Sequence, residues 1–269
     1  MPANPSIHRP TLSVAMIARN EEKNLPRTLE SVRWADEIVI VDSGSVDRTP
    51  EIANSFGAHH SFNRDFRGHP EQKSIAIAKC TSDWILLLDA DEVVSSELAD
   101  EIRQTIANPQ HEAYWVPRLN LFMDRWIRHG GFYPDHKLRL WRRGSAQMET
   151  NVGPHGTPQF DGPKGTLKHD LIHYAYPSFE LYLSHMNDYS SENVAVLVDR
   201  GKATSAAGFL RLGLLNPTAT FIKNYFFRLG FLDGIPGLIY HINHSVYVHW
   251  KYAKAWEGRK TDARKKVSS

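Results

Sequence analysis

The chain has 269 residues, a formal net charge of +2, 41% hydrophobic residues and 23% charged residues. These values are typical of a globular protein and exclude a chain that is disordered throughout. Cys80 is the single cysteine, which excludes an internal disulfide and favours a reducing compartment. We expect no secretory signal, because the first apolar run is short and leads directly into Arg19, and no ordinary membrane-spanning helix.

The charges are distributed unevenly along the chain. Residues 201–269 contain 11 Lys and Arg against 3 Asp and Glu, whereas residues 1–200 contain 21 against 27. An acidic body followed by a basic segment predicts cation-dependent chemistry in the first part and contact with an anionic surface in the second. We therefore expect two domains, an acidic one over residues 1–200 that carries the chemistry and a basic, aromatic-rich helical extension over residues 201–269.

The first hundred residues alternate between apolar runs of strand length and stretches with helical periodicity. Asn20 is expected to cap a helix that begins near Glu21. The expected elements are strand 12–18, a helix from residue 21, strand 37–43, helix 50–56, helix 70–79, a strand from residue 84 and helix 96–107. This order predicts an α/β fold with a doubly wound, mostly parallel sheet that is flanked by helices.

Polar side chains follow each of the three predicted strands. Asn20 and Glu21 follow the first strand, residues 42–47 the second and residues 89–92 the third. Ligands bind at the carboxyl ends of the strands in such sheets, so we expect the three clusters to converge on one edge as a binding site. The alternative for any single cluster is an ordinary polar loop.

Asp89 and Asp91 are two residues apart at the end of an apolar strand, which predicts that both carboxylates point to the same side. Two such carboxylates repel each other unless a cation lies between them. Mg²⁺ or Mn²⁺ takes oxygen ligands and binds phosphates with its remaining positions, so it can neutralise a departing diphosphate. A chance D-x-D sequence is the alternative.

Asp42 also ends an apolar strand, where it is placed to accept hydrogen bonds from the base or ribose of a nucleotide. The alternative is an Asx-turn that closes the Ser-Gly-Ser loop after it. Neither a G-x-G-x-x-G nor a P-loop sequence follows the first strand, which argues against a dinucleotide dehydrogenase or a P-loop NTPase.

The chain contains three motifs in sequence, LSVAMIARNEEKNLPRTLESV, EIVIVDSGSVDRTPEIA and WILLLDADE. In their order and spacing these motifs resemble family 2 glycosyltransferases with the GT-A fold, and the resemblance covers residues 11–110. Residues 130–144 and 226–257 resemble the lipopolysaccharide-core β-1,4-glucosyltransferase subgroup.

The resemblance implies a nucleotide-sugar site. Glu21, the backbone of residues 18–20 and Asp42 would hold the uracil and ribose of a UDP-sugar, and Lys73 would lie near the pyrophosphate. Asp89 would face the ribose or the donor sugar. The implied set comprises Ala18, Asn20, Glu21, Asp42, Ser43, Asp47, Lys73, Asp89 and Arg139.

The resemblance also implies a divalent cation, Mg²⁺ or Mn²⁺, bound by Asp91, and inversion at the anomeric carbon. In such enzymes a carboxylate deprotonates an acceptor hydroxyl, which displaces the nucleoside diphosphate in one step. The subgroup usually has a His-Glu pair that supplies this base, but here His155 is followed by Gly156. The candidates for the base are Asp135 first, Glu149 second and His155 itself.

Arg139, Arg142 and Arg143 form a basic cluster, and one arginine of this set would clamp the diphosphate with a bidentate fork; the alternative is a solvated basic edge strand. His169 and His173 have a spacing that binds zinc on a helix, but residues 171–172 are typical of a strand and the glutamate of H-E-x-x-H is missing. The resemblance places His173 near the active site, as a metal or phosphate contact. A structural histidine is the alternative.

Residues 179–199 predict a helix, and the following segment interleaves aromatic, aliphatic and basic residues. Tyrosine and tryptophan between residues 225 and 256 favour a membrane interface, where Lys251, Lys254, Arg259 and the later basic residues would meet anionic head groups. Pro217 and residues 234–237 would break the segment into short helices that lie in the membrane surface, with His241 and His244 at the interface. The alternative is a helix pair that covers the sheet or forms a dimer interface.

The sequence thus predicts a metal-dependent hexosyltransferase on the cytoplasmic face of the cell membrane. It would transfer a hexose, expected to be glucose, from a UDP-sugar to a lipid-linked or lipopolysaccharide-type acceptor. A polyprenyl-phosphate glycosyltransferase is the close alternative, followed by a metal-dependent phosphohydrolase and an inactive glycan-binding relative. No nucleic-acid partner is expected, because residues 1–200 are acidic and carry no such motif.

Overall fold

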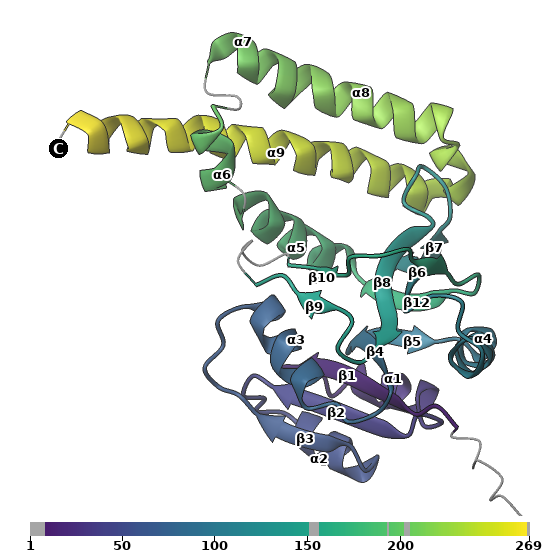
Figure 1. Cartoon of the computed structure of the whole chain (residues 1–269). Coiled ribbons are helices and arrows are strands. Elements are labelled where there is room, and N and C mark those ends of the chain that lie inside the picture. Colours follow the sequence, from purple (N-terminus) through teal and green to yellow (C-terminus); the bar gives the residue numbers. More distant parts are fainter. Residues whose placement is uncertain (1–8, 151–155, 193, 202–204, 268–269) are drawn as a thin grey trace, which may run out of the picture. The chain divides into compact units, whose positions relative to one another are not determined.

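The computed structural model describes residues 9–150, 156–192, 194–201 and 205–267. The chain forms two compact units (Figure 1), the first composed of Met1–Arg118 with Asp135–His173 and the second of Leu119–Pro134 with Tyr174–Ser269. These units are defined by packing, whereas the border expected at residue 200 concerns function, and that border stays a prediction.

The first unit begins with four parallel strands in the order β3-β2-β1-β4. They are β1 (Leu12–Ala18), β2 (Glu37–Asp42), β3 (His59–Phe62) and β4 (Trp84–Asp89). The helices of this part are α1 (Leu25–Ser31), α2 (Thr49–Ser55), α3 (His69–Ala78) and α4 (Ser96–Ala107). Alternate residues of β1, β2 and β4 belong to two different hydrophobic clusters, one on each face, as expected for strands buried on both sides.

Antiparallel strands extend this sheet beyond β4 in the order β8-β6-β12-β5, and the α/β class is confirmed. They are β8 (Asp135–Arg142), β6 (Ala113–Phe122), β12 (Leu171–Tyr176) and β5 (Glu92–Val94). Short strands complete the set: β7 (Arg125–Ile127) and β11 (Gly165–Thr166) pair with β6, and β9 (Gln147–Met148) pairs with β10 (Pro158–Gln159).

The expected cap at Asn20 is wrong. Helix α1 begins at Leu25, and Asn20 has a positive φ of 57° in the loop before it. Its side-chain oxygen accepts a hydrogen bond from the backbone N–H of Val46 instead, at 2.9 Å. Asn20 therefore joins the loops after β1 and β2, a role that asparagine fills because it tolerates the left-handed region.

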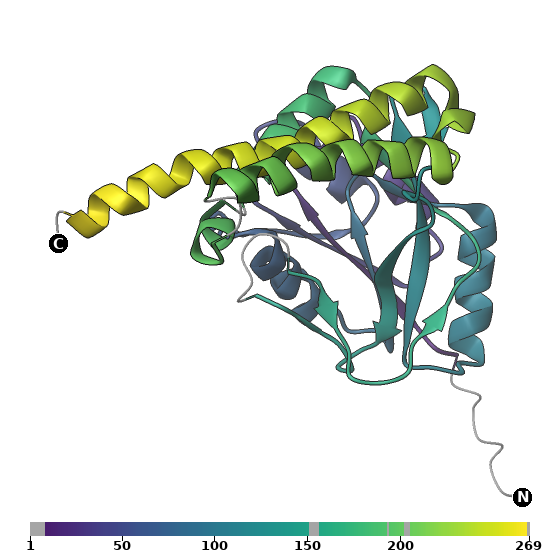
Figure 2. The same ribbon diagram turned by 90° about the horizontal axis from the view of Figure 1, so that it is seen from above.

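The second unit is mainly helical. Its helices are α5 (Phe179–Glu192), α6 (Val194–Asp199), α7 (Ala206–Phe209), α8 (Asn216–Ile222) and α9 (Gly234–Val267). Two π-helical segments, η2 (Leu210–Leu215) and η3 (Lys223–Phe227), flank α8, and the 3₁₀ segment η4 (Gly230–Asp233) precedes α9. Figure 2 shows α8 and α9 side by side, and none of the described helices has the length and apolarity of a membrane span.

The expected division of the C-terminal segment is confirmed at Gly234, whose φ of 70° separates η4 from α9, and is wrong at the prolines. Residues 234–267 form one helix of 34 residues, and Pro236 lies in its first turn. Proline is tolerated there because the first N–H groups of a helix have no partner within the helix. Pro217 lies in α8 directly after the π-helical segment η2, within residues that are helical from Ala206 to Phe227.

Aromatic residues expected at a membrane interface instead build the core of the second unit. Tyr240, Tyr247 and Trp250 pack against the buried side chains of Phe122 and Tyr182. His241 is only 1% exposed, so its expected interfacial position is wrong. Burial, followed by the charges of Lys251 and His241, lowers the pKa of His244 to about 4.

Lys254 and Asp233 hold α9 in place within this unit. The Lys254 ammonium donates to Asn187 and to the Ser190 and Ser191 hydroxyls of α5, so it anchors α9 instead of meeting head groups. Asp233 is buried, accepts the backbone N–H of His129 at 2.8 Å and contacts the His129 ring nitrogen Nδ1 at 2.8 Å. The start of α9 is thereby fixed to the loop after β7.

Candidate active site

The carboxyl ends of β1, β2 and β4 lie side by side in the first unit. Ala18 is the register partner of Asp42, and Ile17 is the register partner of Asp89. Neighbouring strands are about 4.8 Å apart, so the two aspartates stand at the same edge on either side of β1. The predicted convergence of the strand ends is therefore present in the fold.

Hydrogen bonds join the loops that follow these strands. Glu21 donates its backbone N–H to the Thr49 hydroxyl at 2.7 Å, and Glu22 donates to Asp47 Oδ2 at 3.1 Å. Ser43 donates its N–H to the carbonyl of Ala18 at 3.0 Å. Burial opposes the ionisation of Asp47, but hydrogen bonds from Thr49 and Glu22 outweigh it and lower the pKa of Asp47. The first two polar clusters thus form one structured rim.

Asp42 forms the Asx-turn that sequence reasoning left open as the alternative. Its side chain is fully buried, and Oδ1 accepts the backbone N–H groups of Gly44 and Ser45 at 2.8 and 2.7 Å. Oδ2 lies 3.1 Å from His60 Nε2. These contacts shape the loop, and direct contact between Asp42 and a nucleotide stays a prediction.

Asp89 is the centre of a charged cluster at the tip of β4. Lys73 Nζ lies 2.5 Å from Oδ1, and Arg139 Nη2 lies 2.6 Å from Oδ2. Burial alone would raise the pKa of Asp89, but Arg139 and Lys73 hold it well below its usual range. Asp89 is therefore ionised at neutral pH and joins a cation from α3 to a cation from β8.

Arg139 is 5% exposed, so the alternative of a solvated basic edge strand is wrong. Its guanidinium also contacts Glu92 Oε1 at 2.5 Å, and Glu92 is completely buried. Arg118 contacts the same Glu92 oxygen at 3.0 Å and Asp135 Oδ2 at 2.7 Å. Burial opposes the charge of Arg139, but the two carboxylates outweigh burial and raise its pKa.

Asp135, the first candidate for the base, lies at the end of this chain of ion pairs. Lys137 Nζ is 3.0 Å from Oδ1, opposite the contact with Arg118. Burial raises the pKa of Asp135, but the charges of Arg118 and Lys137 outweigh burial and bring the pKa below its usual value. The carboxylate is ionised at neutral pH and is a weak base there.

Asp91 faces His173 instead of Asp89. Its Oδ2 lies 3.2 Å from His173 Nε2, and both side chains are largely buried. His173 stands on β12, where it is the register partner of Glu92. Burial raises the pKa of the nearby Glu21, and the charges of Asp91 and Asp47 add to this effect against a hydrogen bond from Asn24. Several carboxylates thus share this edge of the sheet.

The zinc alternative for the histidine pair is wrong. His169 Nδ1 lies 2.8 Å from Glu101, whereas His173 faces Asp91 on a strand. Within the described ranges, no group of three or more His, Cys, Asp or Glu side chains is arranged to hold a metal ion. A cation at Asp91 and His173 would therefore need further ligands from a substrate.

Glu149 and His155 are the other two candidates for the base. Glu149 follows β9, where its carboxylate accepts a hydrogen bond from Gln159 at 3.2 Å. His155 lies outside the described residues. Their proposed catalytic roles stay predictions.

Sequence reasoning missed three residues that organise the site. Glu92 and Arg118 connect the ion pairs, and Gln72, which is 1% exposed, donates to the Ser43 hydroxyl at 3.0 Å. Glu92 was visible in the D-A-D-E sequence, but its pairing with Arg118 depends on strands that are not adjacent in the chain. Gln72 carried no signal beyond its place in the first turn of α3.

Comparisons with known proteins identify the family of this chain. A profile described as Glycosyl transferase family 2 matches residues 13–164, more than half of the chain. An uncharacterized glycosyltransferase of Rickettsia typhi is 31% identical over 242 residues, which cover 85% of this chain and 80% of the relative. The lipopolysaccharide core biosynthesis glycosyltransferase LpsC of Rhizobium meliloti is 27% identical over 266 residues, or 95% of this chain and 96% of LpsC.

A solved structure supports the fold. The mannosyltransferase PcManGT from Pyrobaculum calidifontis, in complex with GDP-Man and Mn²⁺, has a TM-score of 0.55 and 15% identity over 92% of this chain and 87% of its own. The GT-A-type sheet expected from the sequence is confirmed. This protein belongs to glycosyl transferase family 2, and as a glycosyltransferase it is an enzyme.

Proposed function

We propose that the enzyme transfers a hexose, with glucose as the first candidate, from a UDP-sugar to a lipid-linked or lipopolysaccharide-core-type glycan, with inversion at the anomeric carbon. One observation carries the proposal. Asp89 is held between Lys73 and Arg139 at the tip of β4, and Asp91 faces His173 just beyond it. This is the edge at which open α/β sheets bind their ligands.

The charge balance of the cluster supports an anionic ligand. Its connected ion pairs contain four cations and three carboxylates, which leaves an excess of one positive charge. The members are Lys73, Arg139, Arg118 and Lys137 with Asp89, Glu92 and Asp135. A diphosphate that approached this edge would meet the two cations beside Asp89, while a divalent cation would offset the carboxylates of Asp47 and Asp91 at the same edge.

The Asp91 and His173 side chains fit a divalent cation. An oxygen and an imidazole nitrogen 3.2 Å apart form a small donor pair. The Asp91 carboxylate suits Mn²⁺ or Mg²⁺, which commonly completes its coordination with phosphate oxygens and water, and His173 would lie beside the cation. When bound, the cation would supply stabilisation of the negative charge on the departing diphosphate.

The reaction needs one bond formed and one broken. The acceptor hydroxyl oxygen attacks the anomeric carbon, the bond from that carbon to the diphosphate oxygen breaks, and UDP leaves with the electron pair. Lys73 and Arg139 are placed to meet that charge, while Asp42 and Glu21 would hold the base and ribose. Asp135 would take the proton of the acceptor, with Glu149 as the second candidate.

The acceptor class is supported by the similarity to LpsC over 95% of this chain. Residues 201–269, with 11 Lys and Arg against 3 Asp and Glu, favour contact with an anionic membrane. We place the enzyme on the cytoplasmic face of the cell membrane, where nucleotide sugars and lipid-linked acceptors would meet.

The lowered pKa of Asp135 favours the polyprenyl-phosphate acceptor as a second candidate. A phosphate oxygen is already ionised at neutral pH, so its attack requires no base. An Asp135→Asn variant distinguishes the two. A hydroxyl acceptor predicts a loss of kcat of at least about 100-fold, whereas a phosphate acceptor predicts a change within about threefold.

Product formation with a panel of UDP-sugars and GDP-mannose, in the presence of Mg²⁺ or Mn²⁺, tests the proposal. The panel includes lipopolysaccharide-core and polyprenyl-phosphate acceptors. We expect transfer from one UDP-hexose and a loss of more than about tenfold in the Asp91→Ala variant. Release of inorganic phosphate without transfer, or a smaller loss in the variant, would contradict it.

A further inference from the structure

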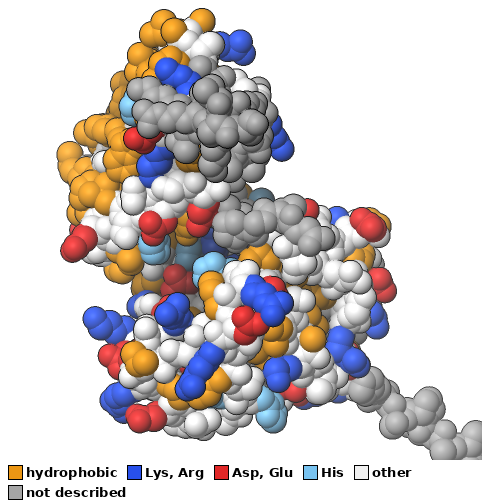
Figure 3. Space-filling view, turned by 90° about the vertical axis from the view of Figure 1, so that its left-hand side faces the viewer, with side chains coloured by type: hydrophobic (Ala, Val, Ile, Leu, Met, Phe, Trp, Pro, Cys, Tyr) orange, Lys and Arg blue, Asp and Glu red, His pale blue; other side chains and the backbone are white. Residues whose placement is uncertain are grey.

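The second unit exposes large hydrophobic side chains that the proposed reaction does not use. Phe227 is 80% exposed, Ile235 69% and Leu215 67%, and further exposed leucine, isoleucine and phenylalanine residues lie between positions 210 and 242. We call these exposed hydrophobic side chains of residues 210–242 the apolar face. Figure 3 shows hydrophobic side chains gathered at the upper left, in the helical part of the protein. Patches of this kind mark interaction sites.

Among residues 210–242, the exposed charged side chains are all positive. Arg211, Lys223 and Arg228 are exposed among the hydrophobic residues. The sequence contains no Asp or Glu from residue 201 to residue 232. Asp233, the next acid, is 1% exposed and already bonded to His129. A surface that combines apolar side chains with cations alone matches an anionic lipid surface.

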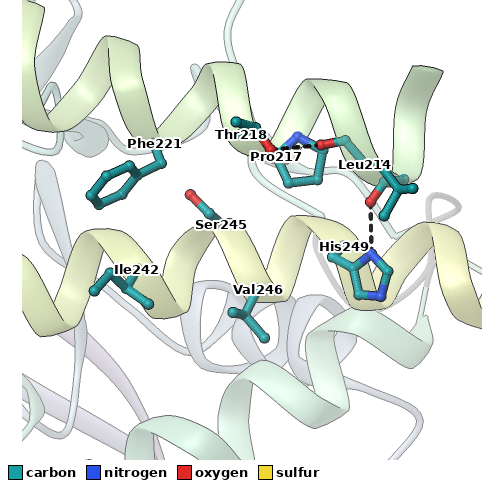
Figure 4. A pocket seen from close by; sticks show the side chains of 9 residues that line it. Leu214, Pro217, Thr218, Phe221, Ile242, Ser245, Val246 and His249 are labelled. Atoms are coloured by element: carbon teal, nitrogen blue, oxygen red, sulfur yellow. Dashed lines mark hydrogen bonds between the residues drawn. The ribbon is translucent and has the colours of Figure 1, made fainter. Parts of the chain in front are cut away.

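A groove between α8 and α9 adjoins this face (Figure 4). Its volume is about 400 Å³, and Leu214 and Ile242 belong both to its lining and to the apolar face. The polar groups that line it are engaged with the backbone: Thr218 donates to the Leu214 carbonyl at 3.0 Å, and Ser245 donates to the His241 carbonyl at 3.1 Å.

The third polar group of the groove is His249, whose Nδ1 lies 2.6 Å from the Gly213 carbonyl oxygen. Because that contact and the two hydroxyl contacts occupy these groups, the groove offers a ligand mainly hydrocarbon surface from Leu214, Phe221 and Ile242. A site of this chemistry takes an apolar chain in preference to a sugar or a phosphate.

We propose that the apolar face inserts into one leaflet of an anionic bilayer and that the groove between α8 and α9 takes a lipid acyl chain. The inference rests on the proposed function, which places the acceptor on a lipid, and it identifies the surface that meets that lipid. A second copy of the chain is a poorer occupant, because a two-fold contact would set the same exposed cations against one another.

Vesicle flotation without nucleotide sugar or acceptor tests this inference. We expect the wild-type chain to bind vesicles of phosphatidylethanolamine and phosphatidylglycerol at a ratio of ~3:1 and to bind phosphatidylcholine vesicles at least about tenfold less. The triple variant Leu215→Ser, Phe227→Ser, Ile235→Ser should lose at least about tenfold of the binding to the anionic vesicles. The matched double variant Phe62→Ser, Phe66→Ser alters exposed aromatic residues of the first unit and should bind as the wild type does.

A fluorescent label reports insertion directly. Burial raises the pKa of the Cys80 thiol to about 12, so an added cysteine can be labelled selectively. An environment-sensitive dye on Phe227→Cys should shift to the blue with anionic vesicles, and the same dye on Ser55→Cys of α2 should not. An unshifted dye at position 227, or a triple variant that binds vesicles as the wild type does, would overturn the inference. So would a wild-type dimer that the triple variant converts to a monomer.

Measurements of vesicle binding and of sugar transfer distinguish a failure of the lipid-inserting face from a failure of the proposed function. A chain that binds anionic vesicles through Phe227 but transfers no sugar would refute the proposed function alone. A chain that transfers a hexose but does not bind these vesicles would refute the lipid-inserting face alone. Thermal unfolding of the triple variant should stay within about 3 °C of the wild type, since all three positions are exposed.

Discussion

Glu92 is the residue on which the charged cluster depends most. It is completely buried and accepts hydrogen bonds from Arg118 and Arg139 on one oxygen and from the backbone N–H of Asp89 on the other. Each arginine then contacts a second carboxylate, Asp135 or Asp89. Glu92 thus sets the positions of the groups that we propose to act on the diphosphate and the acceptor.

Replacing Glu92 with Gln should lower the free energy of unfolding by about 3 kcal/mol, because it removes the fully buried carboxylate that Arg118 and Arg139 share and leaves each arginine with one countercharge. Urea unfolding checks this prediction. The Asp100→Asn variant is the control, since its ion pair with Arg103 on α4 is exposed and its loss should change stability by less than ~0.5 kcal/mol. Equal changes in the free energy of unfolding for the two substitutions would show that Glu92 does not stabilise the cluster.

His244 gives the second unit a pH dependence. Its pKa is about 4 in the folded chain against an ordinary value of 6.5, through burial first and then the charges of Lys251 and His241. Between these two values the unfolded chain binds a proton that the folded chain does not. Stability therefore falls as the pH decreases from 6.5 toward 4, by on the order of 2 kcal/mol.

Thermal or urea unfolding at several pH values measures this slope. The His244→Gln variant removes the titrating group, so its stability should change less than that of the wild type between pH 6.5 and pH 4.5. Parallel curves for the two proteins would rule out His244 as the source.

The positions of the key acids could be predicted from the sequence, but their partners could not. Asp89 and Asp91 follow an apolar run, and the end of such a run is visible locally. The pairing of Asp89 with Arg139 requires β8 to lie beside β4, which no local periodicity encodes. Asp42 was ambiguous, because a nucleotide contact and an Asx-turn place the same residue at the same strand end.

At the scale of elements, the close contact of η4 with α9 depends on glycine. A Cβ at Gly230 would lie 2.3 Å from the His241 ring, and His241 is itself buried. We expect Gly230→Ala to destabilise the fold by about 1–3 kcal/mol, because the ring cannot move into a packed core without strain. Urea unfolding again gives the measurement.

Gly258 provides a matched control on α9. A Cβ there would lie 3.4 Å from Val194 and Val198, which is ordinary contact. Gly258→Ala should therefore be neutral or stabilise the helix by up to about 1 kcal/mol. A Gly230→Ala variant as stable as Gly258→Ala would contradict the packing described for His241.

Elements with a strong local signal were predictable and those fixed by distant pairing were not. The apolar runs of β1, β2 and β4 and the amphipathic α4 matched their expected positions closely. Strands β6 and β8 are antiparallel, and even their nearest paired residues, Arg118 and Asp135, are separated by more than fifteen residues. A local sequence pattern therefore could not place them side by side. The C-terminal segment was misjudged in part, because neither Pro217 within its helical run nor Pro236 in the first turn of α9 interrupts a helix.

At the scale of the whole molecule, each of the two units holds a different proposed site. The first holds the ion-pair cluster at the edge of the sheet, and the second holds the apolar face and its groove. The uneven charge of the sequence predicted two roles, and both stay proposals. Family membership follows from the comparisons, while donor, acceptor and membrane surface remain proposals.

The central claim is that Asp91 and His173 bind a nucleoside diphosphate together with a divalent cation. Calorimetric titration of UDP into the protein, with and without Mn²⁺, tests it without any acceptor. Mn²⁺ should tighten UDP binding to the wild type by at least about tenfold, and this gain should disappear in Asp91→Asn. Equal affinity with and without Mn²⁺ in the wild type, or an undiminished gain in the variant, would contradict the claim.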